Sequence, residues 1–174
     1  PLLNELSVVN PRPLPADPCQ LDELTESLSA HGVKVIRFPC LQFEAINGPQ
    51  IEEALANLAQ YQWLILTSSN GVDFFMQAVQ RYSISLAEFS HLGIAAIGEG
   101  TAGRLQSHGL FASLVPNSFV AESLLQDLLA QSQPQQRFLL PRAAQAREVL
   151  VQGLRQQGRV VEDLAVYQAH KVVP

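Results

Sequence analysis

RFLLPRAAQAREVLVQGLRQQGRVVEDLAVYQ, residues 137–168, is the segment that decides the fold, because residues 8–42 resemble it. With Gly158 aligned on Gly32, the following pairs coincide: Leu150 and Leu24, Leu154 and Leu28, Val161 and Val35, Leu164 and Phe38, Tyr167 and Leu41, Gln168 and Gln42. After a slip of four residues, Pro141-Arg142 aligns with Pro11-Arg12. Each copy predicts the order strand, Pro-Arg loop, helix, glycine, strand. Such a repeat indicates a duplication, although any two units of this type look alike.

The positions of the two copies bear on domain organisation. Residues 43–136 lie between the copies, whereas only Ala169–Pro174 follow the second one. If the chain is a duplication, we expect its second copy to be cut off midway.

The composition predicts a soluble globular protein of one domain or two small ones. The 174 residues are 47% hydrophobic and 16% charged, and the net charge is −5. An acidic chain argues against broad nucleic-acid binding, which needs a basic face. Any anionic ligand must therefore be held by local groups.

Cysteine, histidine and hydropathy patterns give no sign of a metal, a membrane or secretion. Cys19 and Cys40 lack partners at metal-ligand spacing, and the four histidines are scattered. No apolar run reaches the roughly 20 residues of a membrane helix, and no signal peptide is evident. We expect free thiols and a cytoplasmic protein.

Apolar runs and helical periodicity alternate along the whole chain. Strands are predicted at 6–9, 33–38, 63–66, 92–97, 112–115, 138–140 and 160–167, with helices between them and Gly32, Gly109 and Gly158 as helix stops. Uninterrupted alternation of this kind predicts an α/β fold with a parallel sheet.

Two strand-to-helix turns carry candidate binding groups. Thr67-Ser68-Ser69-Asn70-Gly71 follows the strand 63–66, so its hydroxyls and free N–H groups could bind an anion or only cap a helix. Gly98 to Gly103 reads G-x-G-x-x-G after the strand 92–97, a dinucleotide pattern. That pattern is weakened because its turn belongs to an inner strand and because the acid downstream, Glu122, lies at a helix start.

Five motifs in register resemble the uroporphyrinogen-III synthase family over nearly the whole chain. They are TSSNGV at 67–72, AIGEGTA at 96–102, VPNSFVAESL at 115–124, LPRA at 140–143 and VYQ at 166–168. One departure is Asn10-Pro11-Arg12-Pro13, where the family commonly has Thr-Arg-Pro after its first strand.

The resemblance implies two flavodoxin-like parallel-sheet domains joined by a two-stranded ladder, formed here by Leu41–Ala45 and Tyr167–Lys171. Residues 1–40 would begin domain 1, residues 41–168 would form domain 2, and residues 169–174 would return toward domain 1. The first domain would be incomplete in this chain, because its C-terminal complement is missing.

The resemblance also implies a lyase of tetrapyrrole biosynthesis that acts without a cofactor or metal, and we expect a monomer. Its substrate, hydroxymethylbilane, would lose water and close to uroporphyrinogen III with its last ring inverted. Tyr167 would help the hydroxide leave, since a phenol donates a proton at neutral pH. The expected substrate-binding residues are Thr67, Ser68, Ser69, Gly98, Thr101, Arg142, Ala143 and Arg12.

All of these binding residues except Arg12 come from three turns that are expected to be helix N-termini, at 67–70, 98–101 and 141–143, where carboxylates are favoured. Tyr167 could instead be an aromatic residue that packs in the ladder. Two other classes remain possible: a two-lobed protein that binds a small molecule without converting it, and a dinucleotide-binding enzyme.

Overall fold

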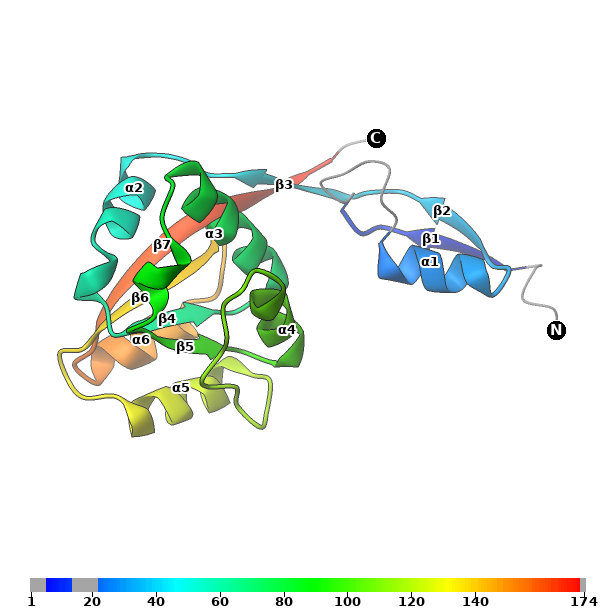
Figure 1. The fold of residues 1–174 in the computed structure, drawn as a ribbon. Coiled ribbons are helices and arrows are strands. Elements are labelled where there is room, and N and C mark those ends of the chain that lie inside the picture. The colour runs from blue at the N-terminus through cyan, green and yellow to red at the C-terminus, as the bar shows by residue number, and fades with distance from the viewer. Residues whose placement is uncertain (1–5, 14–21, 173–174) are drawn as a thin grey trace. The chain divides into compact units, whose positions relative to one another are not determined.

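The computed structural model describes residues 6–13 and 22–172, which divide into two compact units. One unit comprises Pro1–Glu44 with Ala169–Pro174, and the other comprises Ala45–Gln168 (Figure 1). Cys19, part of the expected pair of free thiols, lies outside the described residues, whereas Cys40 is exposed and free. No helix in the described ranges is long and apolar enough to cross a membrane.

The first unit contains a parallel strand pair joined by a helix. β1 (Ser7–Asn10) pairs with β2 (Lys34–Arg37), and α1 (Glu23–Ala30) connects them. The side chain of Asp22 caps α1 by accepting from the Thr25 N–H at 3.2 Å. The hydroxyl of Thr25 also donates to this carboxylate, and that bond, more than any other cause, lowers the pKa of Asp22.

A second sheet has the strand order β3-β7-β6-β4-β5, and its strands β4, β5 and β6, with most of β7, form the second unit. The strands are β3 (Leu41–Ala45), β4 (Trp63–Leu66), β5 (Gly93–Ala96), β6 (Arg137–Ala143) and β7 (Val160–Lys171). All pairings among β4 to β7 are parallel, which confirms the predicted α/β class with parallel sheets. β5 lies at the sheet edge, so its prediction as an inner strand is wrong.

β3 and β7 form the expected ladder, and it is antiparallel. The N–H of Ile46 donates to Val166 O at 2.9 Å, and the N–H of Val172 donates to Cys40 O at 3.1 Å. As residue numbers rise along β3, those of their partners in β7 fall, so the two strands run in opposite directions.

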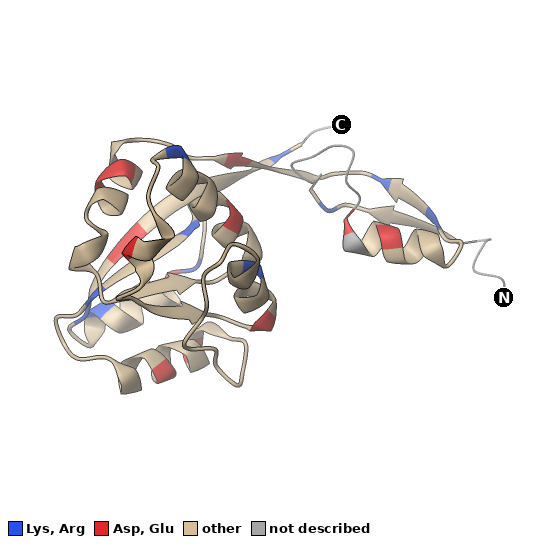
Figure 2. Cartoon of the chain, viewed as in Figure 1, with Lys and Arg blue, Asp and Glu red and all other residues tan. Residues whose placement is uncertain are grey.

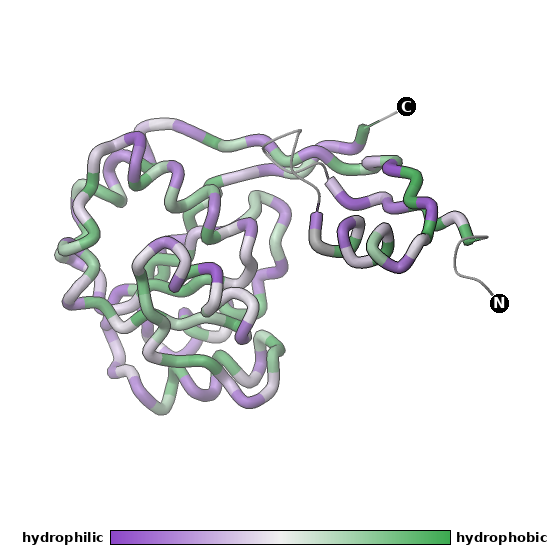
Figure 3. Tube along the Cα trace, turned by 45° about the vertical axis from the view of Figure 1, so that its right-hand side comes forward, coloured by the Kyte–Doolittle hydropathy of each residue, from purple (hydrophilic) through white to green (hydrophobic). Residues whose placement is uncertain are grey.

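Helices pack on the sheet through apolar faces. They are α2 (Pro49–Ala56), α3 (Ser69–Arg81), α4 (Glu99–Ser107), α5 (Ala121–Gln131) and α6 (Val149–Gln156), with short 3₁₀ turns at Leu58–Gln60 and Leu86–Phe89. Hydrophobic and hydrophilic residues alternate along their traces (Figure 3). α5 and α6 contribute Leu124, Leu128 and Leu154, each fully buried, to one cluster with Phe138 of β6.

The two repeated units end their helices in the same way. Elsewhere the structure makes two exceptions to the sequence prediction. Gly32 and Gly158 end α1 and α6 with φ of 80° and 76°, which is the left-handed conformation expected of glycine helix stops. Pro141 and Arg142, however, lie inside β6 and not in a loop. β4 pairs with β6 only at Phe138 and Leu139, so further along β6 no ladder N–H is needed on the β4 side, although the pairing with β7 continues, and an unpaired side of a strand can accommodate a proline.

The predicted strand at 112–115 is the second exception. It is wrong, because the segment makes only a single bridge, between Leu114 and Ala95. The N–H of Ser113 donates to Ile94 O at 2.8 Å and the N–H of Ala96 donates to Leu114 O at 2.9 Å, so this segment satisfies polar groups at the edge of β5 without forming a strand. Gly109, with φ of 83°, ends α4 as expected.

We expect Gly93→Ala to lower the free energy of unfolding by about 1–2 kcal/mol. A Cβ at Gly93 would lie 2.7 Å from the Trp63 ring, which is itself stacked on Phe138 with centroids 6.2 Å apart. Gly103→Ala is the matched control: nothing lies within 4 Å of its Cβ, and alanine in a helix should add about 0.5–1 kcal/mol. Urea unfolding followed by Trp63 fluorescence measures both, and equal effects would contradict the packing argument.

Candidate active site at the carboxyl edge of the sheet

The parallel strands β4 to β7 bring most candidate residues to one edge of the sheet. Thr67 follows the end of β4, Gly98 lies just beyond β5, and Ala143 ends β6. Tyr167 lies opposite Ala143 on β7. Ligands of parallel α/β proteins bind at this edge, because the strand-to-helix loops gather there.

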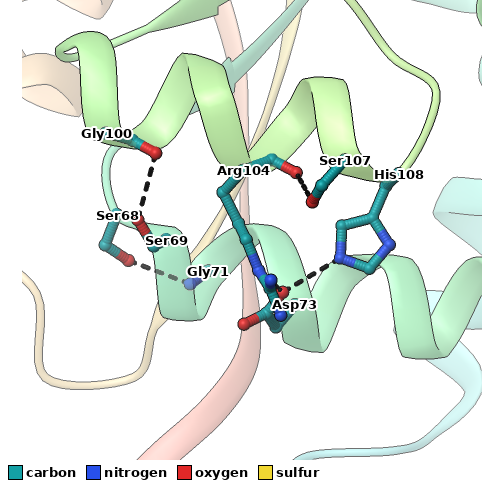
Figure 4. A network of polar contacts seen from close by, with 8 residues as sticks. All are labelled: Ser68, Ser69, Gly71, Asp73, Gly100, Arg104, Ser107 and His108. Carbon is teal, nitrogen blue, oxygen red and sulfur yellow. Dashed lines mark hydrogen bonds and ion pairs between the residues drawn. The ribbon is translucent and has the colours of Figure 1, made fainter. Parts of the chain in front are cut away.

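The turn after β4 is a capped helix start, as predicted. Ser68 is the N-cap of α3, and its Oγ accepts from the Gly71 N–H at 2.9 Å (Figure 4). Thr67 and Ser68 are half-buried, whereas Ser69 is exposed. The Ser69 hydroxyl lies 3.4 Å from Gly100 O, a long hydrogen bond between the starts of α3 and α4 (Figure 4).

Tyr167 is held against α3 at the same place. A bulge in the β6–β7 pairing matches Arg142 with Ala165 but Ala143 with Tyr167, so Val166 is passed over. The phenol oxygen of Tyr167 lies 3.4 Å from Ser68 Oγ, and its ring stacks on Phe74 with centroids 4.8 Å apart. The side chain is therefore both packed in the core, with 7% of its surface exposed, and in contact with a turn hydroxyl.

Phe74 is a site residue that sequence reasoning missed. It lies beside the apolar stripe of α3, and only the fold brings it onto Tyr167. It also lines a groove of about 390 Å³ along the C-terminal half of α3, which is separate from the helix start at the carboxyl edge. The other lining residues are Ala45, Ile46, Asn47, Gln77, Ala78, Gln80 and Arg81.

Gly98 and Thr101 begin α4. Gly98 is the N-cap, and no side chain caps this helix. The N–H of Thr101 donates to Gly98 O at 3.1 Å, whereas the N–H groups of Glu99 and Gly100 come too early in α4 to have a partner within the helix. Thr101 is buried, with 6% of its surface exposed. Phe119, 59% exposed, covers Gly98 so closely that a Cβ there would be 3.1 Å from its ring.

The glycines of the G-x-G-x-x-G pattern lack the packing of a dinucleotide site. In that fingerprint the third glycine allows close approach of helix and strand. Here an added Cβ at Gly100 or Gly103 would meet nothing within 4 Å. The pattern is thus an ordinary helix start.

The expected helix N-terminus at 141–143 is wrong, and with it the expected setting of Arg142. β6 continues through Ala143, and the next helix begins only at Val149. Arg142 is 6% exposed and binds Asp163 of β7 through two of its nitrogens. That hydrogen-bonded partner raises the pKa of Arg142 above its usual range. Its Nη1 donates to Arg147 O at 2.6 Å, so the guanidinium is fully engaged.

Arg12 belongs to the other unit. It is exposed, and its N–H donates to the side chain of Asn10 at 3.1 Å. Asn10 is 2% exposed and its amide donates to Asp22 and Thr25, which fixes the turn after β1.

A second polar cluster lies at the opposite, amino edge of the sheet. Tyr61 is fully buried, donates to Glu162, and lies under the guanidinium of Arg137 at 5.8 Å. Burial first, and then Glu162, raise the pKa of the Tyr61 phenol above its usual value. Among the described residues, no three His, Cys, Asp or Glu side chains are grouped as metal ligands.

A parallel α/β unit with hydroxyls, helix starts and a tyrosine at its carboxyl edge is an arrangement typical of α/β proteins that bind small molecules at this edge. The family model described as uroporphyrinogen-III synthase HemD matches residues 22–174. The chain belongs to this family, as the sequence motifs indicated.

Curated relatives agree with this assignment. A uroporphyrinogen-III synthase of Synechococcus elongatus is 33% identical over 156 residues, which cover 86% of this chain and 57% of that protein. A putative uroporphyrinogen-III synthase of Methanocaldococcus jannaschii is 30% identical over 76% of this chain and 53% of its own length. The chain spans about half the length of such relatives.

Solved structures support the fold. A mutant uroporphyrinogen III synthase from the extremely thermophilic bacterium Thermus thermophilus has a TM-score of 0.66 over 96% of this chain and 64% of its own, at 21% identity. A uroporphyrinogen-III synthetase from Helicobacter pylori has a TM-score of 0.54 over 82% of this chain and 58% of its own, at 19% identity.

Proposed function

We propose that the protein is a uroporphyrinogen-III synthase, which cyclises hydroxymethylbilane with loss of water and inversion of the last ring. Family membership supports this reaction. The observation that carries the proposal is the contact of Tyr167 with Ser68 at the carboxyl edge of the sheet, 3.4 Å between their oxygens.

Tyr167 is the proposed proton donor. As the carbon–oxygen bond of the hydroxymethyl group breaks, the phenol donates a proton to the departing oxygen, and water leaves. The substituted carbon of the last pyrrole ring, which carries the bridge to the third ring, bonds to the freed methylene carbon and gives a spiro intermediate. The bond from that carbon to the bridging methylene then breaks, and the methylene bonds to the free α-carbon of the same ring, which inverts the ring. The proton that this α-carbon loses replaces the one that Tyr167 gave. Ser68 donates a hydrogen bond to the phenol oxygen and keeps it oriented while the phenol proton goes to the departing oxygen.

The substrate carries carboxylates on every ring, and helix starts are proposed to receive them. Thr67, Ser68 and Ser69 surround the start of α3, and Gly98 and Thr101 belong to the start of α4. Their N–H groups and the positive end of each helix dipole favour carboxylates. Ala143 is proposed to shape the wall beside Tyr167, opposite which it lies.

Arg12 and Arg142 were both predicted to bind the substrate, but their surroundings favour different roles. Arg12 is exposed and is proposed to bind a carboxylate from the first unit. Arg142 already binds Asp163, so we propose that it holds the backbone after β6 instead of contacting the substrate.

We also propose that the active protein has two lobes, of which residues 1–40 begin the first and residues 41–168 form the second, with residues 169–174 returning toward the first. The enzyme is proposed to act as a cytoplasmic monomer, without a cofactor.

The test is the isomer formed from freshly made hydroxymethylbilane, with the complete gene product and the 174-residue chain incubated in parallel. After oxidation, chromatography separates uroporphyrins III and I. Isomer III from the complete product but not from the short chain is the expected result, because hydroxymethylbilane closes to isomer I by itself. Isomer I alone from both would reject the enzyme and favour a binding protein.

A further inference from the structure

Positively charged side chains are scarce in the second unit, so few of them are candidates for binding a carboxylate. Residues 45–168 contain no lysine, and their arginines are Arg81, Arg104, Arg137, Arg142, Arg147, Arg155 and Arg159. Figure 2 shows these few positive residues dispersed over the unit. In this unit, a Lys or Arg side chain can bind a carboxylate of the substrate only if it is an arginine whose guanidinium is not already bound to other protein groups.

Five of the seven guanidinium groups are engaged inside the fold. Arg104 pairs with Asp73 (Figure 4), Arg137 lies over Tyr61 and 4.0 Å from Glu162, and Arg142 pairs with Asp163. Arg155 donates to Val161 O at 2.8 Å, and Arg159 donates to Ser132 O at 2.7 Å. Within the described ranges, the guanidinium groups of Arg147 and Arg81 have no hydrogen bond or ion pair.

Arg147 lies in the loop that follows β6, and this loop is tied to the candidate site. The N–H of Ala144 donates to Tyr167 O at 2.9 Å, and the N–H of Ala146 donates to Ala143 O at 3.1 Å. Arg142 holds the Arg147 carbonyl at 2.6 Å, so the backbone is fixed while the Arg147 side chain is exposed.

The carboxylates near Arg147 in the fold or the sequence are bound by other side chains, so Arg147 is available to bind a ligand. Asp163 is bound by Arg142, and the carboxylate of Glu148 accepts from Gln152 Nε2 at 2.7 Å. Arg81, by contrast, is the last residue of α3, twelve residues after Ser69 and roughly 18 Å further along the helix at 1.5 Å per residue.

We propose that Arg147 is a substrate-binding residue, whose guanidinium pairs with an acetate or propionate carboxylate on a pyrrole ring close to Tyr167. This inference rests on the proposed function. A planar guanidinium fork forms two parallel hydrogen bonds with one carboxylate, which fixes the ring that carries it. The residue that sequence reasoning chose for this task, Arg142, fixes the position of Arg147.

The experiment compares Arg147→Gln, Arg147→Lys and Arg81→Gln in the complete gene product, by steady-state kinetics with hydroxymethylbilane. Arg147→Gln should raise KM by about tenfold and leave kcat within about twofold, because a charged pair present in substrate and transition state is lost. Arg147→Lys should recover part of the loss. Arg81→Gln removes the same charge and should leave KM within about twofold.

Equal KM increases in Arg147→Gln and Arg81→Gln would overturn the proposal, since overall charge would then explain both. An unchanged KM in Arg147→Gln would overturn the proposal for Arg147. If the unmodified protein still forms isomer III, the proposed function stands in that case. All three substitutions are at exposed positions, so each variant should have a thermal midpoint within about 2 °C of the unmodified protein. That result would exclude loss of folding as the cause of a change in KM. Failure of the unmodified protein to form isomer III would reject the function itself.

Discussion

Asp163→Ala is expected to lower the free energy of unfolding by about 2–3 kcal/mol. The substitution leaves the Arg142 guanidinium, 7% exposed, without its carboxylate in the middle of the β6–β7 pair. Removing one partner of a buried ion pair costs more than the pair contributes, because the remaining charge stays desolvated. The Asp163 side chain is 30% exposed, so water reduces the penalty below that of a fully buried pair.

Arg104→Ala is the control for this prediction. Its partner Asp73 also accepts from His108 Nε2 at 3.0 Å, and the Arg104 side chain is 47% exposed. We expect a loss of no more than about 1 kcal/mol there. Urea unfolding followed by the single tryptophan, Trp63, measures both variants. Equal losses would mean that burial does not set the cost of breaking these pairs.

Local features of the sequence were sufficient to predict much of the fold. Gly32, Gly109 and Gly158 adopt positive φ at helix ends, which is a property of glycine itself and so is visible without the fold. The hydroxyls at 67–69 follow a buried strand at the start of a helix, as predicted, and one of them, Ser68, caps that helix. The ladder was expected from the family resemblance, and its two strands are neighbours.

What sequence reasoning missed depends on register between strands. Arg142 follows an apolar run and precedes a polar segment, so it reads as a loop residue. Only the β6–β7 register brings Asp163, 21 residues away, within reach of it and extends the strand to Ala143. The stacking of Phe74 on Tyr167 has the same origin, because a helix and a strand far apart in sequence supply the two rings. No local pattern records either contact.

Tyr167→Phe is expected to lower kcat for formation of uroporphyrinogen III by about tenfold to 100-fold, at the low end of what a general acid contributes. The phenylalanine ring keeps the stack on Phe74, so only the hydroxyl that lies 3.4 Å from Ser68 Oγ is removed. The fold should therefore survive, with a thermal midpoint close to that of the unmodified protein.

The isomer ratio gives this prediction a second readout. When the catalysed closure slows, spontaneous closure competes, so the share of isomer I should rise in Tyr167→Phe while KM changes little. Tyr82→Phe is the matched control, because it also removes one phenol oxygen from α3's end of the same unit, where that oxygen makes only a long bond of 3.5 Å to Gly48 O. If Tyr167→Phe and Tyr82→Phe both turn over at the unmodified rate, Tyr167 is a packing residue, and the proton for the departing hydroxyl must come from another donor at the carboxyl edge.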